Sequence, residues 1–131
     1  MENLGRQLHF TVPGPPVGKQ RHRPRFGGGK PITPAKTRSY EKHVRVNAWV
    51  ALNNARDWLT DFEGYFRLTI DIYFANKNRP DTSNVLKSIE DGCNGVIWKD
   101  DKMVVSGTRD IFFSKKPRVE VFIEPYEPKE E

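Results

Sequence analysis

The most regular alternation of hydrophobic and polar residues lies between positions 64 and 75. One side of this alternation consists of Phe66, Leu68, Ile70, Ile72 and Phe74, with more polar residues between them. A two-residue period is typical of a β-strand with one buried face. Similar patterns predict strands at 7–12, 103–113 and 118–124, with the SKKP segment as the turn between the last two.

A helical period replaces this alternation between residue 34 and about residue 56. Apolar residues recur there at spacings of three and four, at Tyr40, Val44, Ala48, Ala51, Leu52 and Ala55. Thr33 is a suitable N-cap and Pro34 suits the first turn. Lys36, Lys42 and Arg45 fall away from the apolar stripe. The pattern therefore predicts a long amphipathic helix with basic residues near its start.

A second, shorter helix of about ten residues is predicted to begin at residues 81–83. The residues of its apolar face are Val85, Leu86, Ile89 and Cys93, and those of its opposite, polar face are Asn84, Lys87 and Asp91. Asp81, Thr82 and Ser83 can each serve as N-cap, and Gly92 or Gly95 is expected to stop the helix. The element order predicts an α+β fold, a small mixed sheet with a long helix and a short active-site helix packed on it.

Composition limits the class of protein. The 131 residues, 36% of them hydrophobic, suit one domain spanning 1–131. No apolar run approaches the length of a membrane helix, and the N-terminus lacks the layout of a signal peptide. Cys93 is the only cysteine, which excludes an intrachain disulfide and a thiolate zinc site. We expect a cytoplasmic protein with no membrane partner and no small-molecule substrate.

Positive charge is concentrated in one part of the chain. The net charge is +5, and residues 18–45 contain nine Lys and Arg residues against the single acid Glu41, whereas the tail at 124–131 is acidic. A basic arm at 17–33 followed by a basic helix start is typical of a surface that follows nucleic-acid phosphates. The alternative is a solvated basic loop. The predicted DNA-binding residues are Lys19, Arg21, Arg23, Arg25, Lys36, Arg38 and Asn84.

Acidic residues flank the short helix, with Asp81 before it and Asp100 and Asp101 after it. A helix that reverses the chain can bring Asp81 and Asp101 together, and converging carboxylates favour a bound divalent cation. Oxygen ligands suit Mg²⁺ or Mn²⁺ rather than zinc. Lys87 on the polar face could then stabilise charge on a phosphate. The alternatives are that Asp81 only caps the helix, that Asp100 and Asp101 are solvated loop acids, and that Lys87 is a surface lysine paired with Asp91.

Several motifs in order resemble the RusA family of Holliday junction resolvases, phage-associated endodeoxyribonucleases that nick branched DNA with Mg²⁺. The family's Asp-x-Asp-Asn-x-x-Lys run stands here as DTSNVLK at 81–87, followed by DGCNG at 91–95 and DD at 100–101. The segments PPVGKQRHRPRF and TPAKTRSYE are similar to the family's basic arm and first-helix start. The resemblance runs from about residue 9 to residue 113.

This resemblance implies a homodimer that nicks four-way junctions in recombination and repair, in a bacterial host or prophage. It implies Mg²⁺ as cofactor, which Mn²⁺ can replace. Asp81 and Asp101 match metal-binding catalytic acids, and Lys87 matches the catalytic lysine. Asp91 and Asp100 match positions near the metal. Ser83 stands where the family usually has a second metal-binding aspartate, so it is a candidate ligand of a weaker kind.

Two other functions remain open at this stage. The first is a non-catalytic protein that binds branched DNA, in which Ser83 marks a degraded metal site. The second is a PD-(D/E)xK nuclease, because Pro80-Asp81 and Asp100-Asp101-Lys102 spell that signature. The second requires a strand through residues 83–92.

Overall fold

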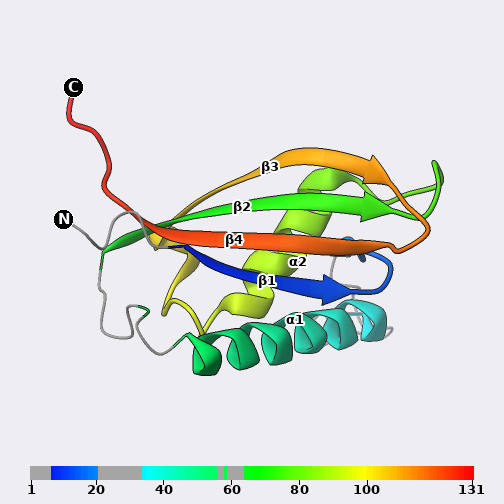
Figure 1. Cartoon of the computed structure of the whole chain (residues 1–131), viewed down its shortest axis with the longest axis horizontal. Coiled ribbons are helices and arrows are strands. Elements are labelled where there is room, and N and C mark those ends of the chain that lie inside the picture. Colours follow the sequence, from blue (N-terminus) through cyan, green and yellow to red (C-terminus); the bar gives the residue numbers. More distant parts are fainter. Residues whose placement is uncertain (1–6, 21–33, 56–57, 59–63) are drawn as a thin grey trace, which may run out of the picture.

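The described part of the chain folds into four strands and two α-helices in the predicted order (Figure 1). The computed structural model describes residues 7–20, 34–55, 58 and 64–131. In chain order the elements are β1 (Leu8–Pro13), α1 (Ala35–Asn54), β2 (Tyr65–Phe74), α2 (Thr82–Cys93), the short 3₁₀ helix η2 (Asp101–Met103), β3 (Val104–Phe113) and β4 (Arg118–Tyr126). The predicted α+β class is confirmed.

The strands form one mixed sheet in the order β1-β4-β2-β3. The last strand, β4, lies between β1 and β2 and is antiparallel to both. β2 and β3 are parallel, with Phe66 opposite Val104 at the start of the pairing. Parallel neighbours cannot be joined by a tight turn, so the chain crosses over through α2. This crossover sets α2 and the loop after it beside the start of β3.

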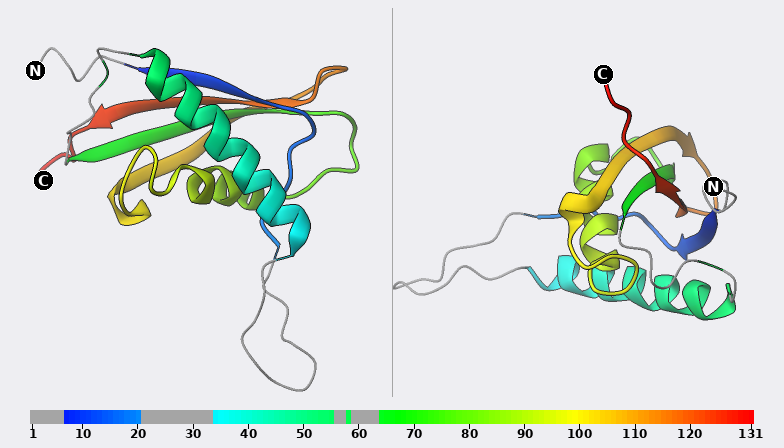
Figure 2. Two further views of the ribbon diagram at one scale, coloured as in Figure 1. Left: turned by 90° about the horizontal axis from the view of Figure 1, so that it is seen from below. Right: turned by 90° about the vertical axis from the view of Figure 1, so that its left-hand side faces the viewer.

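Both helices lie on the same side of the curved sheet (Figure 2). The core is formed where the inward-facing residues of the strands, such as Leu68, Ile70 and Val121, meet the apolar faces of the helices. Val44 from α1 and Ile89 from α2 are fully buried. Buried residues of the apolar stripes predicted for both helices therefore belong to this core.

The structure corrects the predicted start of α1 and decides between the two glycines predicted to end α2. Pro34 occupies the N-cap position of α1 that we assigned to Thr33, which lies outside the described residues. The ψ of Pro34 is 146°, an extended value, so the helix begins one residue later, at Ala35. Gly92 does not stop α2 but lies buried inside it, because α1 approaches too closely for a side chain. The turn that ends α2 uses Gly95, whose φ is +83° and favours glycine.

The three tryptophans differ in burial, and the last strand is longer than predicted. Trp58 and Trp98 are buried in the core, whereas Trp49 on α1 is 58% exposed. β4 continues to Tyr126, two residues beyond the predicted end, so part of the predicted acidic tail belongs to the sheet. No helix in the described part of the chain is long and apolar enough to cross a membrane.

Candidate functional site

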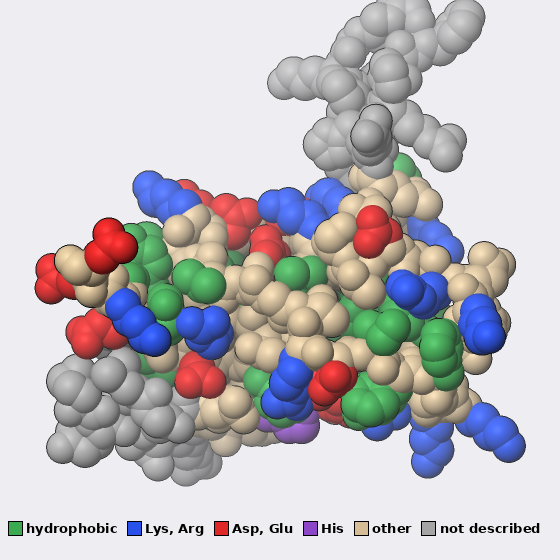
Figure 3. Space-filling view, turned by 90° about the horizontal axis from the view of Figure 1, so that it is seen from above, with side chains coloured by type: hydrophobic (Ala, Val, Ile, Leu, Met, Phe, Trp, Pro, Cys, Tyr) green, Lys and Arg blue, Asp and Glu red, His purple; other side chains and the backbone are tan. Residues whose placement is uncertain are grey.

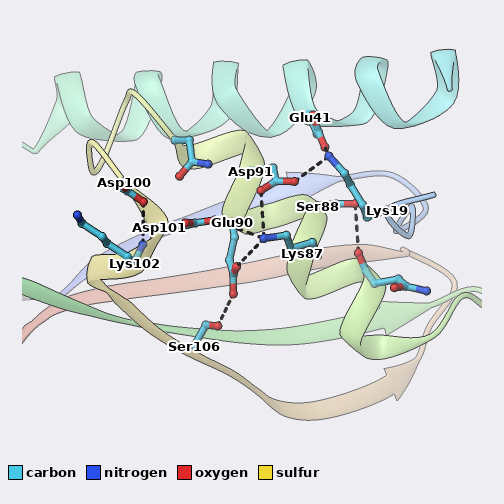
Figure 4. Close-up of polar contacts among 12 residues, drawn as sticks. Lys19, Glu41, Lys87, Ser88, Glu90, Asp91, Asp100, Asp101, Lys102 and Ser106 are labelled. Atoms are coloured by element: carbon cyan, nitrogen blue, oxygen red, sulfur yellow. Dashed lines mark hydrogen bonds and ion pairs between the residues drawn. The ribbon is translucent and has the colours of Figure 1, made fainter. Parts of the chain in front are cut away.

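Three carboxylates surround the ammonium group of Lys87 (Figure 4). Its Nζ atom lies 3.3 Å from Asp101 Oδ2, 3.7 Å from Asp91 Oδ1 and 3.8 Å from Glu90 Oε1. The Lys87 side chain is about half exposed (48%). One accessible lysine and three acids therefore share a single site between α2 and η2.

The helical spacing of α2 positions most of this site. Glu90 and Asp91 follow Lys87 by three and four residues, so all three side chains leave the same face of the helix. Val85 and Ile89 on the opposite face are fully buried against the sheet. The packing of the apolar face thus fixes the direction in which the charged face points.

The loop after α2 brings Asp101 back to the helix. It turns at Gly95, whose N–H donates to the carbonyl of Trp98 at 2.7 Å. The indole N–H of Trp98 donates to Asn94 Oδ1 at 2.8 Å, and its ring is buried. The buried indole fixes the chain at Trp98, and η2 begins three residues later with Asp101. This is how a residue distant in sequence reaches Lys87.

Glu90 is a member of the site that sequence reasoning did not identify. One of its carboxylate oxygens accepts a hydrogen bond from the hydroxyl of Ser106 on β3, and the other faces Lys87. The carboxylate therefore connects the sheet to the lysine and restricts where the lysine can move. Its spacing of three residues from Lys87 was the available signal.

Asp91 lies between two lysines. Its Oδ2 atom is 2.8 Å from Lys19 Nζ, and its Oδ1 atom is the one that faces Lys87. Lys19 also contacts Glu41 Oε2 on α1 at 2.7 Å. The single acid in the basic region of the sequence is thus a partner of the arm's first lysine. Residues from the arm, α1 and α2 meet at this point.

The charges of the site shift the pKa values of its lysines. Burial lowers the pKa of Lys87, but the carboxylates of Asp91, Asp101 and Glu90 outweigh it, and the pKa is raised above its ordinary value. The pKa of Lys19 is raised in the same way, with burial opposing the carboxylates of Asp91 and Glu41. Both lysines are therefore cations at neutral pH. Lys87 can stabilise negative charge or donate a proton, but it does not act as a base.

Asp100 has a local role beside the cluster. Its side chain caps η2 by accepting a hydrogen bond from the backbone N–H of Lys102 at 3.0 Å. This bond lowers the pKa of Asp100 below its ordinary value, more than slight burial raises it. Asp100 is thus an exposed, ionised carboxylate next to Asp101.

Asp81, one of the three predicted N-cap candidates, is the N-cap of α2. Its carboxylate accepts a hydrogen bond from the backbone N–H of Ser83 at 3.3 Å. Together with Lys19, Lys36 and Asn84 it lines a hollow of about 230 Å³ between the arm, α1 and the start of α2. A predicted catalytic acid and three predicted DNA-binding residues therefore border one open space.

The donor chemistry of these residues suits a hard divalent cation, because the candidate ligands are carboxylates and a hydroxyl. In the described parts of the chain, however, no three His, Cys, Asp or Glu side chains are grouped so that they could hold a metal ion. Asp81 begins α2, whereas Asp91 lies near its end. Position 83 is a serine, whose hydroxyl is a weaker ligand for a divalent cation than a carboxylate. Convergence of Asp81 with Asp101 stays a prediction.

The remaining predicted residues divide into two sets. Lys36 and Arg38 lie exposed in the first turn of α1, and Asn84 is exposed on α2. Arg21, Arg23 and Arg25 lie outside the described residues.

The PD-(D/E)xK interpretation required a strand through 83–92, and it is wrong because Thr82–Cys93 is helical.

The sequence of the chain is similar to known proteins. The family model described as endodeoxyribonuclease RusA matches residues 13–124. An uncharacterized protein, YqaN of Bacillus subtilis (strain 168), is 29% identical over 139 residues, which cover 88% of this chain and 94% of that protein. The matched region of the family model contains every residue of the candidate site.

Proposed function

Because the chain belongs to the RusA family of structure-specific endodeoxyribonucleases, we propose that it nicks four-way DNA junctions with Mg²⁺ as its cofactor, which Mn²⁺ can replace. The observation that carries this proposal is the 3.3 Å contact between Lys87 and Asp101. These two residues were predicted to be catalytic from motifs that lie on different elements. Their contact supports a shared role in one reaction.

We assign the cation to Asp81 and Asp101, with Asp91, Asp100 and Ser83 as further candidate ligands. A bound divalent cation would activate a water molecule and polarise the scissile phosphate. These residues would hold the cation beside α2 and η2, where exposed side chains leave room for a DNA backbone to approach. Glu90 keeps Lys87 at this face by its bond to Ser106.

Lys87 acts on the charge that develops during phosphodiester hydrolysis. Negative charge grows on the phosphate and on the leaving oxygen, and a positioned ammonium group stabilises it. The raised pKa of Lys87 keeps this group protonated at neutral pH. The same ammonium can donate a proton to the leaving oxygen.

The DNA path is proposed to run over the hollow beside Asp81. Lys36 and Asn84 line this hollow and can contact backbone phosphates. Arg21, Arg23 and Arg25 belong to the chain segment between Gln20 and α1, so they can extend the same basic surface. These contacts would orient the scissile phosphate towards the acids.

We further propose that the protein is a homodimer. Exposed hydrophobic residues on the edge strand β3 support this proposal, namely Val105, Ile111, Phe112 and Phe113. Figure 3 views the molecule from above β3 and shows hydrophobic side chains next to basic ones on this side. An exposed apolar edge strand is a ready surface for association.

A second candidate function is binding of branched DNA without cleavage. Ser83 favours it, because a hydroxyl is a weaker ligand for a divalent cation than a carboxylate. In this case the basic surface is used but the phosphodiester bond is not hydrolysed.

Cleavage assays on synthetic four-way, flap and linear DNA, each with Mg²⁺ or Mn²⁺, separate the two functions. The nuclease proposal predicts nicking of the four-way junction in preference to the linear duplex. If the protein binds the junction but does not nick it with either Mg²⁺ or Mn²⁺, the nuclease proposal is refuted and the second function is supported.

A further inference from the structure

The first residues of the basic arm are attached to the active-site helix. The backbone N–H of Lys19 donates to the carbonyl of Asn84 at 2.8 Å, and that of Gln20 donates to Thr37 Oγ1 at 3.3 Å. A Cβ atom on Gly18 would lie only 3.1 Å from the Cβ atoms of Asn84 and Pro80. The arm therefore leaves β1 in tight contact with the first turns of α2 and α1.

The side chain of Lys19 is directed inwards from this segment, between Glu41 and Asp91 (Figure 4). Its ammonium lies 2.7 Å from the first carboxylate and 2.8 Å from the second, and the side chain is only 23% exposed. Two of its three donors thus have anionic partners. A DNA phosphate that replaced one of these carboxylates would take away its contact with Lys19.

Asp91 contacts both lysines, so the position of Lys19 can affect the position of Lys87. Because Lys19 holds the Oδ2 atom, the Oδ1 atom stays 3.7 Å from Lys87 Nζ, and Asp101 at 3.3 Å is the nearer partner. Without Lys19, Asp91 would be free to close on Lys87 and compete with Asp101. The lysine would then be drawn along α2 and away from the reacting phosphate.

We propose that Lys19 is a positioning residue that holds Asp91 away from Lys87, and that it does not bind DNA phosphate. This replaces the role that sequence reasoning gave it. The expected effect of Lys19 on nicking rests on the proposed nuclease function. The absence of a contact between Lys19 and DNA phosphate does not depend on that function.

The salt dependence of binding tests the claim about contacts. Each phosphate contact contributes about 0.9 to the slope of log K against log salt for duplex DNA. Lys36→Met, which removes an exposed lysine of the same hollow, is expected to reduce the slope by about that amount. Lys19→Met is expected to leave the slope of the wild-type chain unchanged. A reduction of about 0.9 in Lys19→Met would overturn the inference.

Nicking of a four-way junction with Mg²⁺ tests the consequence for catalysis. Lys19→Met should lower kcat by about 10- to 100-fold, as loss of a group that orients a site residue typically does, while KM changes little. Lys19→Arg should recover part of the rate, because guanidinium can pair with both carboxylates. Combining Lys19→Met with Asp91→Asn should add little to the loss from Asp91→Asn alone. An unchanged kcat in Lys19→Met contradicts the inference.

A measurement on the unmodified chain keeps the inference testable if a variant fails to fold. With ¹⁵N-labelled lysine, adding a four-way junction should shift the ammonium signal of Lys36 and leave that of Lys19 in place. A shift of the Lys19 signal as large as that of Lys36 would refute the positioning role. If the wild-type chain does not nick, the proposed function fails, whereas the salt slope and these spectra still decide the role of Lys19.

Discussion

Gly92→Ala is expected to push α1 and α2 apart. A Cβ atom at position 92 would lie 2.6 Å from both Cβ and Cγ1 of Val44 and 3.1 Å from the carbonyl oxygen of Glu41. Rotation of the Val44 side chain moves Cγ1, but its Cβ is fixed by the backbone of α1. Val44 is fully buried, so it has no free space to move into. The helices themselves must shift.

The cost of this shift can be set against the gain from removing a glycine. Overpacking a core costs about 1–3 kcal/mol, and the upper end applies because no side-chain rotation relieves the clash. Alanine in place of glycine within a helix returns about 1 kcal/mol. The net loss in the free energy of unfolding is therefore about 2 kcal/mol, which lowers the Tm of a domain of this size by roughly 6–10 °C.

Urea and thermal unfolding of Gly92→Ala, measured beside Gly107→Ala, check this expectation. Gly107 on β3 is the matched control, because an added Cβ there meets no atom within 4 Å. The control should be as stable as the wild type or slightly more stable. If Gly92→Ala were as stable as Gly107→Ala, the close packing of α1 on α2 would be refuted.

Three further predictions concern single side chains. Complete burial raises the pKa of the Cys93 thiol to about 12. A thiol reagent at neutral pH should therefore label the unfolded chain but not the native one. Rapid labelling of the native chain would contradict this prediction. Burial raises the pKa of Glu120, but hydrogen bonds from Thr11, Arg118 and His9 outweigh it and lower the pKa below its ordinary value. A carboxyl group with a lowered pKa in the folded state stabilises the fold at pH values above its unfolded pKa, and this stabilisation is lost as pH falls. Glu120→Gln should therefore be less stable than wild type at neutral pH, and the difference should close below about pH 4. A difference in stability that does not change with pH would contradict this prediction. Ser83→Asp should lower the Mg²⁺ concentration needed for nicking, and an unchanged requirement would show that Ser83 does not limit the metal site.

Local patterns were sufficient to predict most elements of this fold. The alternation at 64–75 and the apolar stripe of the long helix each reflect burial of one face, which depends mainly on neighbours in the chain. The same reasoning placed Lys87 and Asp91 together, because residues four apart share a helix face. It also identified Asp81 as a cap, since capping is a property of a few adjacent residues.

Features that depend on distant contacts could not be predicted in this way. Gly92 was one of two glycines expected to end the helix, and only the approach of Val44 from α1 explains why it lies inside the helix. Sequence reasoning did not identify Glu41 and Asp91 as the partners of Lys19, because they come from two other elements. The position of β4 between β1 and β2 likewise depends on pairing of the two ends of the chain.

Nicking of a four-way junction by Asp101→Asn, beside the wild type and Asp100→Asn, tests the central claim most directly. Asparagine keeps the size of the side chain but removes the charge that contacts Lys87 and is proposed to hold the cation. The account predicts that the wild type nicks the junction with Mg²⁺, and that Asp101→Asn binds it equally well without nicking. Nicking by Asp101→Asn at the wild-type rate would contradict the account.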